Sequence, residues 1–363
     1  MAGRIIMHVD LDYFYAQCEE LRRKDLKDKP VVVCVYSARG GDSGAVSTCN
    51  YKARAYGVKA GMPIVQAKRL LKDVQDAVFL PVDEQYYANV SDAVMAILRA
   101  SSDAFEQVSI DEAYMDVSIR CKNFDDAVEL ASRLKDEIKA TVGLTCSIGV
   151  GMNKLIAKMA SDYKKPDGLT VVRAEDTQEF INPMSVGKLL WVGKKTEAML
   201  NSMGIYTIAD LAKVSIDRLI REFGRKMGVY LYNASRGIDE EPVKESAMAK
   251  QISRMTTLKS NTSAVEDMLD DLNTLSMEVH KSLVGQGLLF RSVGIMLVYE
   301  DLSMRSKAKM LRHYTNRADD IMRYARALLE EMLGESSKPV RRLGVKVSDL
   351  ESAEGQETLQ RFM

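Results

Sequence analysis

Two adjacent carboxylates, Asp111 and Glu112, occur in the segment VSIDEAYMD, whose flanks have the composition of β-strands. Successive side chains of a regular strand point to opposite faces, so both acids can meet one ligand only where the chain turns. The segment therefore predicts a β-hairpin with its tip near Ser109 and Ile110, which aims both carboxylates at one point. Acids at a hairpin tip are also ordinary solvated turn residues, and this stretch alone leaves both alternatives open.

The size and charge of the chain narrow the class of protein. A chain of 363 residues is too long for one ordinary core and predicts two or three domains. Lys plus Arg equals Asp plus Glu, at 51 each, so a nucleic-acid surface has to arise from a local excess of cations. The five cysteines are odd in number and lack CxxC spacing, which indicates reduced thiols and argues against a disulfide framework or a zinc knuckle.

The N-terminus and the hydropathy pattern bear on the location of the protein. The sequence MAGRIIMHVD has an acid too early for a secretory signal. No apolar run approaches the roughly 18 residues of a membrane span. We therefore expect a soluble, cytoplasmic protein with no membrane partner.

The order of the predicted elements indicates several domains of mixed α/β and α+β class. A short apolar run over 4–9 predicts a strand that joins the later sheet built from the hairpin and the strand over 144–150. From 177 to 236 the periodicity is almost wholly helical, and the polar, proline-interrupted stretch over 237–246 is typical of a linker. Helices and strands alternate over the last hundred residues, as in a separate α+β domain.

Asp10 ends the first predicted strand, and together with Asp111 and Glu112 it supplies three carboxylates at one expected sheet edge. Such a cluster suits Mg²⁺, and two such ions about 4 Å apart stabilise the attacking and leaving oxygens in phosphoryl transfer. Nucleotidyl transfer is therefore a plausible reaction. Asp12 and Asp116 also lie nearby, so not every acid can be a ligand, and alternation predicts that Asp116 faces water or caps the sheet.

Five blocks of sequence resemble the Y-family DNA polymerases, specifically the archaeal and bacterial DinB or DNA polymerase IV branch, and most closely its archaeal type. The blocks are DLDYFYAQ, PVVVCVYS, SGAVSTCNYKARAYGVKAGMPI, SIDEAYMDV and GVGMNKLIAKMASDYKKPDGL. The resemblance implies a right-hand polymerase with a palm, small fingers, a helical thumb and an α+β little-finger domain. It also implies template-directed DNA synthesis past lesions without proofreading.

The resemblance places the domains along the chain. It implies a palm over 1–13 and 80–172, fingers over 14–79, a thumb with a helix-hairpin-helix over 173–237, a linker over 238–250, a little finger over 251–348, and a flexible tail with a clamp-binding box over 349–363.

The resemblance also assigns the residues of the reaction centre. Asp10, Asp111 and Glu112 match the metal-binding carboxylates, and the Leu11 carbonyl matches a backbone ligand of the two Mg²⁺ ions. One ion would lower the pKa of the primer 3′-hydroxyl, and the other would hold the triphosphate and neutralise the departing pyrophosphate.

Residues around the incoming nucleotide follow from the same match. Tyr51 and Arg54 are three apart, so on a helix they share a face and can contact one triphosphate. The resemblance assigns both of them, with Lys165, to the triphosphate and places Thr48 near the incoming base. Tyr15 matches the aromatic steric gate against a ribose 2′-hydroxyl, although a core tyrosine is the alternative.

Two basic segments are candidates for DNA contact. VGKKT followed by MGI resembles a helix-hairpin-helix, in which Gly193, Lys194 and Lys195 grip phosphates, but Trp191 replaces the usual first glycine. In SMRSKAKMLRH the cations at 305, 307 and 309 have a period of two, so in a strand they share one face. The residues of this second segment are Arg305, Lys307 and Lys309. An edge strand protected by lysines is the alternative for that segment.

The tail carries a candidate docking motif. Gln356, Leu359 and Phe362 have the spacing Q-x-x-L-x-x-F, which resembles the box by which polymerases bind a ring-shaped sliding clamp. Met363 replaces the usual second aromatic residue, and a frayed terminus that matches by chance is the alternative.

Together these features predict a monomeric, Mg²⁺-dependent DNA-directed DNA polymerase whose partners are primer–template DNA, deoxynucleoside triphosphates and a sliding clamp. Two rivals remain. A nucleotidyl cyclase on a palm-like sheet would need no primer–template, so the basic segments argue against it. A catalytically silent DNA-binding scaffold is disfavoured by the three intact carboxylates.

Overall fold

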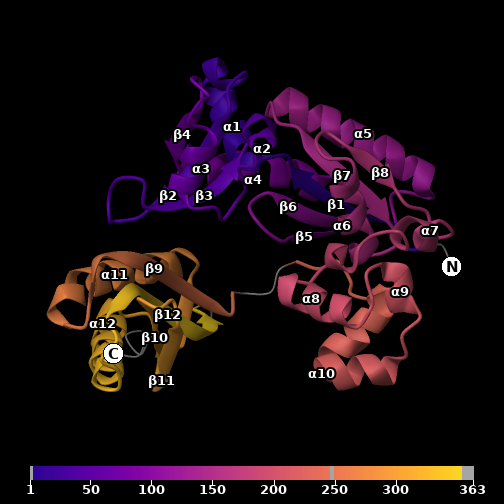
Figure 1. Ribbon diagram of the computed structural model, residues 1–363. Helices are drawn as coiled ribbons and strands as arrows, with labels where there is room; N and C mark the ends of the chain where they lie inside the picture. The colour runs from indigo at the N-terminus through magenta and orange to yellow at the C-terminus, as the bar shows by residue number, and fades with distance from the viewer. Residues whose placement is uncertain (1–2, 246–248, 354–363) are drawn as a thin grey trace, which may run out of the picture. The chain divides into compact units, whose positions relative to one another are not determined.

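The computed structural model describes residues 3–245 and 249–353 and divides them into two compact units (Figure 1). The first unit contains residues 3–33, 47–61 and 70–245. The second contains residues 34–46, 62–69 and 249–353. None of the helices within these ranges is long and apolar enough to span a membrane.

The first unit is built on a five-stranded sheet in the order β5-β6-β1-β7-β8. Its strands are β1 (Ile6–Leu11), β5 (Ala104–Gln107), β6 (Glu112–Asp116), β7 (Cys146–Gly151) and β8 (Leu169–Val171). β1 is antiparallel to both β6 and β7, which confirms that the first strand joins the later sheet.

Both faces of this sheet are covered, and β1 is buried along its whole length. Met7 and Val9 pack into the core beneath helices α4 (Glu84–Ala100) and α5 (Phe124–Thr141). The alternate side chains of β1 face helix α6 (Lys154–Tyr163) on the other side. A Cβ on Gly149 of β7 would lie 2.1 Å from the Ala157 carbonyl oxygen, so α6 lies directly against the strand backbone.

The hairpin predicted from VSIDEAYMD is confirmed. β5 and β6 pair antiparallel, and the backbone N–H groups of Val108 and Ser109 both donate to the Glu112 carbonyl, at 3.0 and 3.2 Å. The chain therefore turns over residues 108–111, directly before Glu112 enters β6.

A smaller three-stranded sheet, β3-β2-β4, lies in the N-terminal region. Its elements are α1 (Phe14–Arg22), a 3₁₀ turn (Lys24–Leu26), β2 (Val31–Tyr36), β3 (Gly44–Cys49), α2 (Tyr51–Ala55), α3 (Ile64–Leu70) and β4 (Val78–Pro81). Asn50 caps α2 because its side-chain oxygen accepts from the Ala53 N–H at 3.0 Å.

Short helices follow the five-stranded sheet, as the periodicity predicts. They are α7 (Thr177–Ile181), a 3₁₀ turn (Val186–Lys188), α8 (Lys194–Ser202), α9 (Ile208–Ala212) and α10 (Ile216–Ala234). Leu189, Leu200, Leu211 and Leu231 are buried together in a core of their own, which lies between these helices.

The second unit contains a four-stranded antiparallel sheet in the order β11-β10-β12-β9. Its elements are β9 (Gln251–Thr262), a 3₁₀ turn (Glu266–Met268), α11 (Leu269–Gly285), β10 (Leu288–Tyr299), β11 (Met304–Thr315), α12 (Ala318–Gly334) and β12 (Val340–Ser352). Both helices pack on one face of the sheet. β12 extends past residue 348, where we expected the flexible tail to begin.

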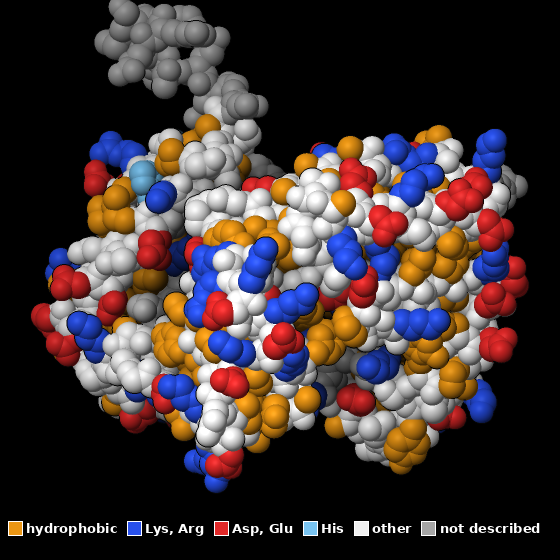
Figure 2. Space-filling view, turned by 90° about the horizontal axis from the view of Figure 1, so that it is seen from above, with side chains coloured by type: hydrophobic (Ala, Val, Ile, Leu, Met, Phe, Trp, Pro, Cys, Tyr) orange, Lys and Arg blue, Asp and Glu red, His pale blue; other side chains and the backbone are white. Residues whose placement is uncertain are grey.

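Charges of both signs are interspersed on the face that Figure 2 draws, with hydrophobic side chains between them. This mixture agrees with the equal totals of acids and bases.

Candidate active site

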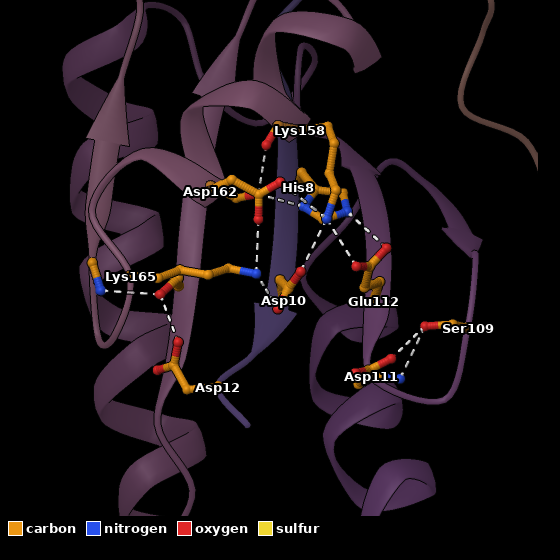
Figure 3. A network of polar contacts seen from close by, with 12 residues as sticks. His8, Asp10, Asp12, Ser109, Asp111, Glu112, Lys158, Asp162 and Lys165 are labelled. Atoms are coloured by element: carbon orange, nitrogen blue, oxygen red, sulfur yellow. Dashed lines mark hydrogen bonds and ion pairs between the residues drawn. The ribbon is translucent and has the colours of Figure 1, made fainter. Parts of the chain in front are cut away.

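Two of the three predicted carboxylates lie close together in the five-stranded sheet, where β1 ends and β6 begins (Figure 3). Asp10 and Glu112 are cross-strand partners in β1 and β6, so their side chains share the face that α6 covers. Asp111 lies at the hairpin tip, where its carboxylate accepts from the Ser109 hydroxyl at 2.6 Å and lies apart from the other two. Among the described residues, no three acidic, histidine or cysteine side chains are placed to hold one metal ion.

Two lysines occupy the space between the carboxylates. Lys158 Nζ lies 3.0 Å from Asp10 Oδ2 and 2.8 Å from Glu112 Oε1, and so bridges the cross-strand pair. Lys165 Nζ lies 2.6 Å from the other oxygen of Asp10 and 2.8 Å from Asp162 Oδ1. The acids are therefore neutralised by ammonium groups at the position where the resemblance places the metal cations.

Burial and ion pairing act in opposite directions on the pKa values of this cluster. Burial raises the pKa of Asp10 to about 7, against the opposing effect of Lys158 and Lys165. Burial alone would lower the pKa of Lys158, but Asp10 and Glu112 raise it above its usual value. Lys158 therefore remains an ammonium, and the ion-paired cluster carries compensating charges.

The donor set fits divalent cations in its chemistry. Asp10 and Glu112 supply hard carboxylate oxygens on one face, held close together by the sheet register. A site with all three acids requires Asp111 to leave Ser109 and Lys158 to release the pair. The sequence pattern does not single out Lys158 or Asp162, although their spacing of four on α6 places them on one helix face.

His8 lies next to this cluster and is fully buried. Its Nδ1 lies 2.8 Å from the Ser161 hydroxyl, and its Nε2 lies 3.7 Å from Glu112 Oε2, which is too long for a hydrogen bond. Burial lowers the pKa of His8 to about 4, so the imidazole is neutral near pH 7.

The other two acids of the region have structural partners. Asp12 accepts hydrogen bonds from the Thr145 and Ser147 hydroxyls at 2.9 and 2.7 Å. Asp116 accepts from the Ser118 backbone N–H at 2.9 Å. Asp12 thus ties β1 to β7, and Asp116 closes the turn after β6.

The predicted triphosphate residues lie on the elements that the sequence predicts. Tyr51 and Arg54 share one face of α2, with the guanidinium carbon 4.8 Å from the Tyr51 ring centroid. Burial raises the pKa of Tyr51, and the charges of Arg54, Asp12 and Lys165 also act on it. Tyr51 therefore lies within electrostatic range of the carboxylate cluster. Thr48 is half-buried in β3.

The predicted sugar gate is held in place by an aromatic stack. The Tyr15 ring stacks on Tyr87 with centroids 4.3 Å apart and an interplanar angle of 18°. Tyr87 is itself fixed, because its hydroxyl donates to Glu19 Oε1 at 2.7 Å. Burial raises the pKa of Tyr15, with the Asp111 charge as the next cause, so the ring lies within electrostatic range of the hairpin tip.

The predicted DNA contacts have different surroundings. Gly193, Lys194 and Lys195 are exposed together where α8 begins. Arg305, Lys307 and Lys309 do share one face of β11, and β11 is an edge strand.

The face that these three residues occupy is the one covered by the helices. Their partners on β10, Leu297, Ile295 and Val293, are all buried under the helices. Lys307 Nζ lies 2.9 Å from Glu331 of α12 and 2.7 Å from Glu335, directly after that helix, so its charge is already paired. The clamp-motif residues Gln356, Leu359 and Phe362, and Met363, lie outside the described residues.

Comparisons with known proteins cover the same regions. Residues 9–162 match the impB/mucB/samB family, residues 249–360 match the C-terminal domain of that family, and residues 189–239 match the thumb domain of DNA polymerase-iota. DNA polymerase IV of Nitrosopumilus maritimus is 46% identical over 100% of both chains. DNA polymerase IV of Methanosarcina acetivorans is 43% identical over 99% of both chains.

Solved structures agree with the family match. A Y-family DNA polymerase chimera of Dbh and Dpo4 is 35% identical with a TM-score of 0.90, covering 96% of this chain and 99% of the other. An insertion ternary complex of Dbh DNA polymerase is 34% identical with a TM-score of 0.70, again covering 96% and 99%. The chain therefore belongs to the impB/mucB/samB family of Y-family DNA polymerases, within the DNA polymerase IV branch.

Proposed function

We propose that this DNA-directed polymerase adds deoxynucleotides to a primer 3′ end through a centre formed by Asp10, Asp111 and Glu112. The observation that carries the proposal is the cross-strand pairing of Asp10 with Glu112 beside a hairpin tip that bears Asp111. The full-length match to DNA polymerase IV sequences supports the same centre. The function is lesion bypass on primer–template DNA without proofreading.

The three carboxylates and the Leu11 carbonyl would hold divalent ions, for which we propose two Mg²⁺. Bound there, such ions would supply positive charge that activates the primer hydroxyl and neutralises the leaving pyrophosphate. The chain prepares the site by keeping Asp10 and Glu112 together, and Lys158 keeps them neutralised beforehand.

Cations and aromatic rings of the chain position the nucleotide. Tyr51, Arg54 and Lys165 contact the triphosphate, where fixed positive charge is worth most as the leaving group becomes more negative. Lys165 already lies 2.6 Å from Asp10, next to the place where chemistry occurs. Thr48 lies near the incoming base, and Tyr15 excludes a 2′-hydroxyl because Tyr87 supports its ring from behind.

Two surfaces contact primer–template DNA in this proposal. Gly193, Lys194 and Lys195 bind phosphates at the start of α8, where helix-terminal N–H groups favour anions. On β11, Arg305 and Lys309 are the exposed members of the cationic strand, and Lys307 contributes less because Glu331 and Glu335 pair with it. These contacts fix position without reading sequence.

The remaining proposals concern assembly and location. The enzyme acts as a monomer in the cytoplasm, and Gln356, Leu359 and Phe362 dock it on a sliding clamp. Tethering would raise the local concentration of a weakly processive enzyme at a stalled primer end. Calorimetry of the tail peptide with the cognate clamp tests this, with Leu359→Ala/Phe362→Ala as the control peptide. Equal heats for the two peptides would remove the clamp assignment.

Primer extension tests the function itself. Extension of a primer on undamaged and on abasic templates is measured once with Mg²⁺ and once with EDTA. We expect extension on both templates with Mg²⁺ and on neither template with EDTA. Extension that survives EDTA would contradict the metal-dependent centre, and a complete stop at the abasic site would contradict lesion bypass. Binding of primer–template without any extension would favour the silent scaffold.

A further inference from the structure

Trp191 is the most exposed aromatic residue among the described residues of the thumb, and the proposed function does not use it. Trp191, the only tryptophan of the chain, lies between the 3₁₀ turn Val186–Lys188 and α8, and its exposed fraction is 73%. A single exposed apolar side chain is common on protein surfaces, so the case for a contact rests on what surrounds the indole.

The backbone on either side of the indole is fixed. Leu189 and Val192 are only 2% and 8% exposed and lie in the core of the thumb. The Val192 N–H donates to the Leu189 carbonyl at 3.1 Å, and the Tyr230 hydroxyl donates to the Leu190 carbonyl. Trp191 therefore projects from a pre-organised turn, which lowers the entropic cost of binding a ligand.

The conformation of Trp191 is unfavourable for a tryptophan. Its φ of +66° lies in the left-handed region, where glycine is tolerated and bulky residues are rare. The turn therefore has the left-handed backbone conformation that suits glycine, the usual residue of this motif at the position of Trp191. The indole has no ring-stacking or cation–π partner among the residues that the structure describes. Strain of this kind is typical of functional sites.

The charges around the indole favour a polyanion. Lys188, Lys194 and Lys195 are exposed around the turn, and none forms an ion pair with a residue that the structure describes. Trp191 also lines a cleft of about 620 Å³, whose opposite wall on α6 includes the active-site residues Lys158 and Asp162. The apolar ring and Lys188 therefore line a cleft that extends to the reaction centre, and Lys194 and Lys195 follow directly after the turn.

We propose that Trp191 contacts the primer–template duplex directly, packing its indole against deoxyribose faces of the backbone while the neighbouring lysines hold phosphates. The inference rests on the proposed DNA synthesis and adds an apolar anchor to its phosphate contacts. Sugar faces are the same in every nucleotide, so the contact is independent of sequence, as lesion bypass requires. A glycine at this position would let the backbone approach the DNA phosphate closely. In this chain the side chain of Trp191 contacts the DNA instead.

The fluorescence of the single tryptophan tests this contact in the whole enzyme. Acrylamide should quench the free protein strongly, because the indole is exposed, and quenching should fall several-fold once primer–template duplex saturates the enzyme. Single-stranded oligonucleotide of the same length is the second arm, and greater protection by it would overturn the duplex assignment. Binding is followed independently by the anisotropy of labelled DNA.

The variants Trp191→Gly and Trp191→Phe separate binding from folding. Trp191→Gly should raise the dissociation constant for duplex about tenfold, with Trp191→Phe in between, and leave the salt slope unchanged because no charge is removed. The urea midpoint of the Trp191→Gly variant should not fall, because glycine adopts the left-handed conformation without strain. Lys194→Ala/Lys195→Ala should instead lower the salt slope by about two. Ile119→Ala, which removes an 87% exposed apolar side chain of the palm, is the control and should bind DNA normally.

The outcomes distinguish this inference from the proposed function. If wild type binds duplex but Trp191 stays accessible to acrylamide, or Trp191→Gly binds as tightly as wild type, the inference is overturned and DNA synthesis stands. If Trp191→Gly loses affinity only in proportion to its loss of folded protein, the indole is structural and the inference also fails. If wild type binds no duplex, both are overturned.

Discussion

The five-stranded sheet of the first unit, which is antiparallel except for the parallel pair β7 and β8, and the fully antiparallel four-stranded sheet of the second unit differ in their exposure. Every residue of β1 and of β7 is buried, because helices cover both faces of the first sheet. In the second sheet α11 and α12 cover one face, and β10 alternates between buried residues such as Ile295 and half-buried ones such as Met296. A sheet covered twice can expose functional groups only where strands end, whereas a sheet covered once offers a whole face.

This difference explains where the polar groups of each sheet lie. Asp10 and Glu112 meet where β1 ends and β6 begins, and Lys158 of the covering helix reaches them. On the second sheet, Arg342 and Lys346 of β12 lie on the open face, opposite to the helices. The first arrangement suits chemistry in a partly buried site, and the second suits contact with an extended ligand.

The largest effect is expected at the covered sheet. Asp10→Ala or Glu112→Ala should reduce primer extension by about 1,000-fold or more, since several kcal/mol of charge stabilisation disappear. DNA affinity, measured by anisotropy, should stay close to wild type. Asp116→Ala in the same sheet is the control and should retain extension. Equal losses of affinity and rate would indicate that Asp10 and Glu112 have a folding role instead.

The supported ring of Tyr15 should control sugar selection. Tyr15→Ala removes the ring that Tyr87 holds in place, so incorporation of ribonucleotides relative to deoxyribonucleotides should rise by roughly 10- to 100-fold. Competition between the two triphosphates in single-turnover extension measures the ratio. Tyr15→Phe keeps the ring and should keep the discrimination. A ratio that does not change in Tyr15→Ala would move the gate to another residue.

Matched glycine substitutions compare the packing of the two sheets. A Cβ at Gly149 would meet the backbone of α6, 2.1 Å from the Ala157 carbonyl oxygen, so Gly149→Ala should lower the free energy of unfolding by about 1–3 kcal/mol or more. A Cβ at Gly344 would come closest to the methyl ends of Met296 and Met255, at 2.9 and 3.0 Å, and would lie 3.2 Å from the Arg254 carbonyl oxygen. The flexible methionine ends can move, so Gly344→Ala should lower the free energy of unfolding by less than about 1 kcal/mol.

Urea denaturation of each full-length variant measures these changes. Gly285→Ala, where nothing lies within 4 Å of the added Cβ, is the control for the substitution itself. Similar losses in Gly149→Ala and Gly344→Ala would contradict the proposed contrast between a covered and an open face.

The smallest effect is expected from the cationic strand. Arg305→Ala/Lys307→Ala/Lys309→Ala should weaken DNA binding for every sequence and reduce the salt slope by about one for each phosphate that the protein no longer neutralises. Lys307 should contribute least, because α12 already pairs with it.

Arg342→Ala/Lys346→Ala on the open face is the matched comparison for that strand. A larger change in salt slope for this pair would assign the DNA contact to the open face. An unchanged slope in the triple variant would leave β11 as an edge strand protected by its lysines.

Local patterns were sufficient for several elements of the fold and the site. The acids in VSIDEAYMD predicted a turn because period-two alternation is intrinsic to a strand, and β5 and β6 confirm it. Helix α5 (Phe124–Thr141) likewise rests on local features, because Asn123 caps it and apolar residues recur at helical spacing. The family blocks indicated a polymerase, which the comparisons confirm.

Other features were decided only by tertiary packing. Periodicity put Arg305, Lys307 and Lys309 on one face, but the placement of α12 decided that this is the covered face. Lys158 is far from Asp10 in sequence, and only α6 packing on Gly149 brings it there.

The conformation of Trp191 shows the same limit. Its identity is read from the sequence, but the core residues on either side impose its left-handed backbone. The sequence by itself therefore determined the elements and the chemical groups they carry, because propensity and periodicity act over a few residues. Which groups meet depended on helices packing against sheets over long separations, where burial and close contact select one arrangement among many.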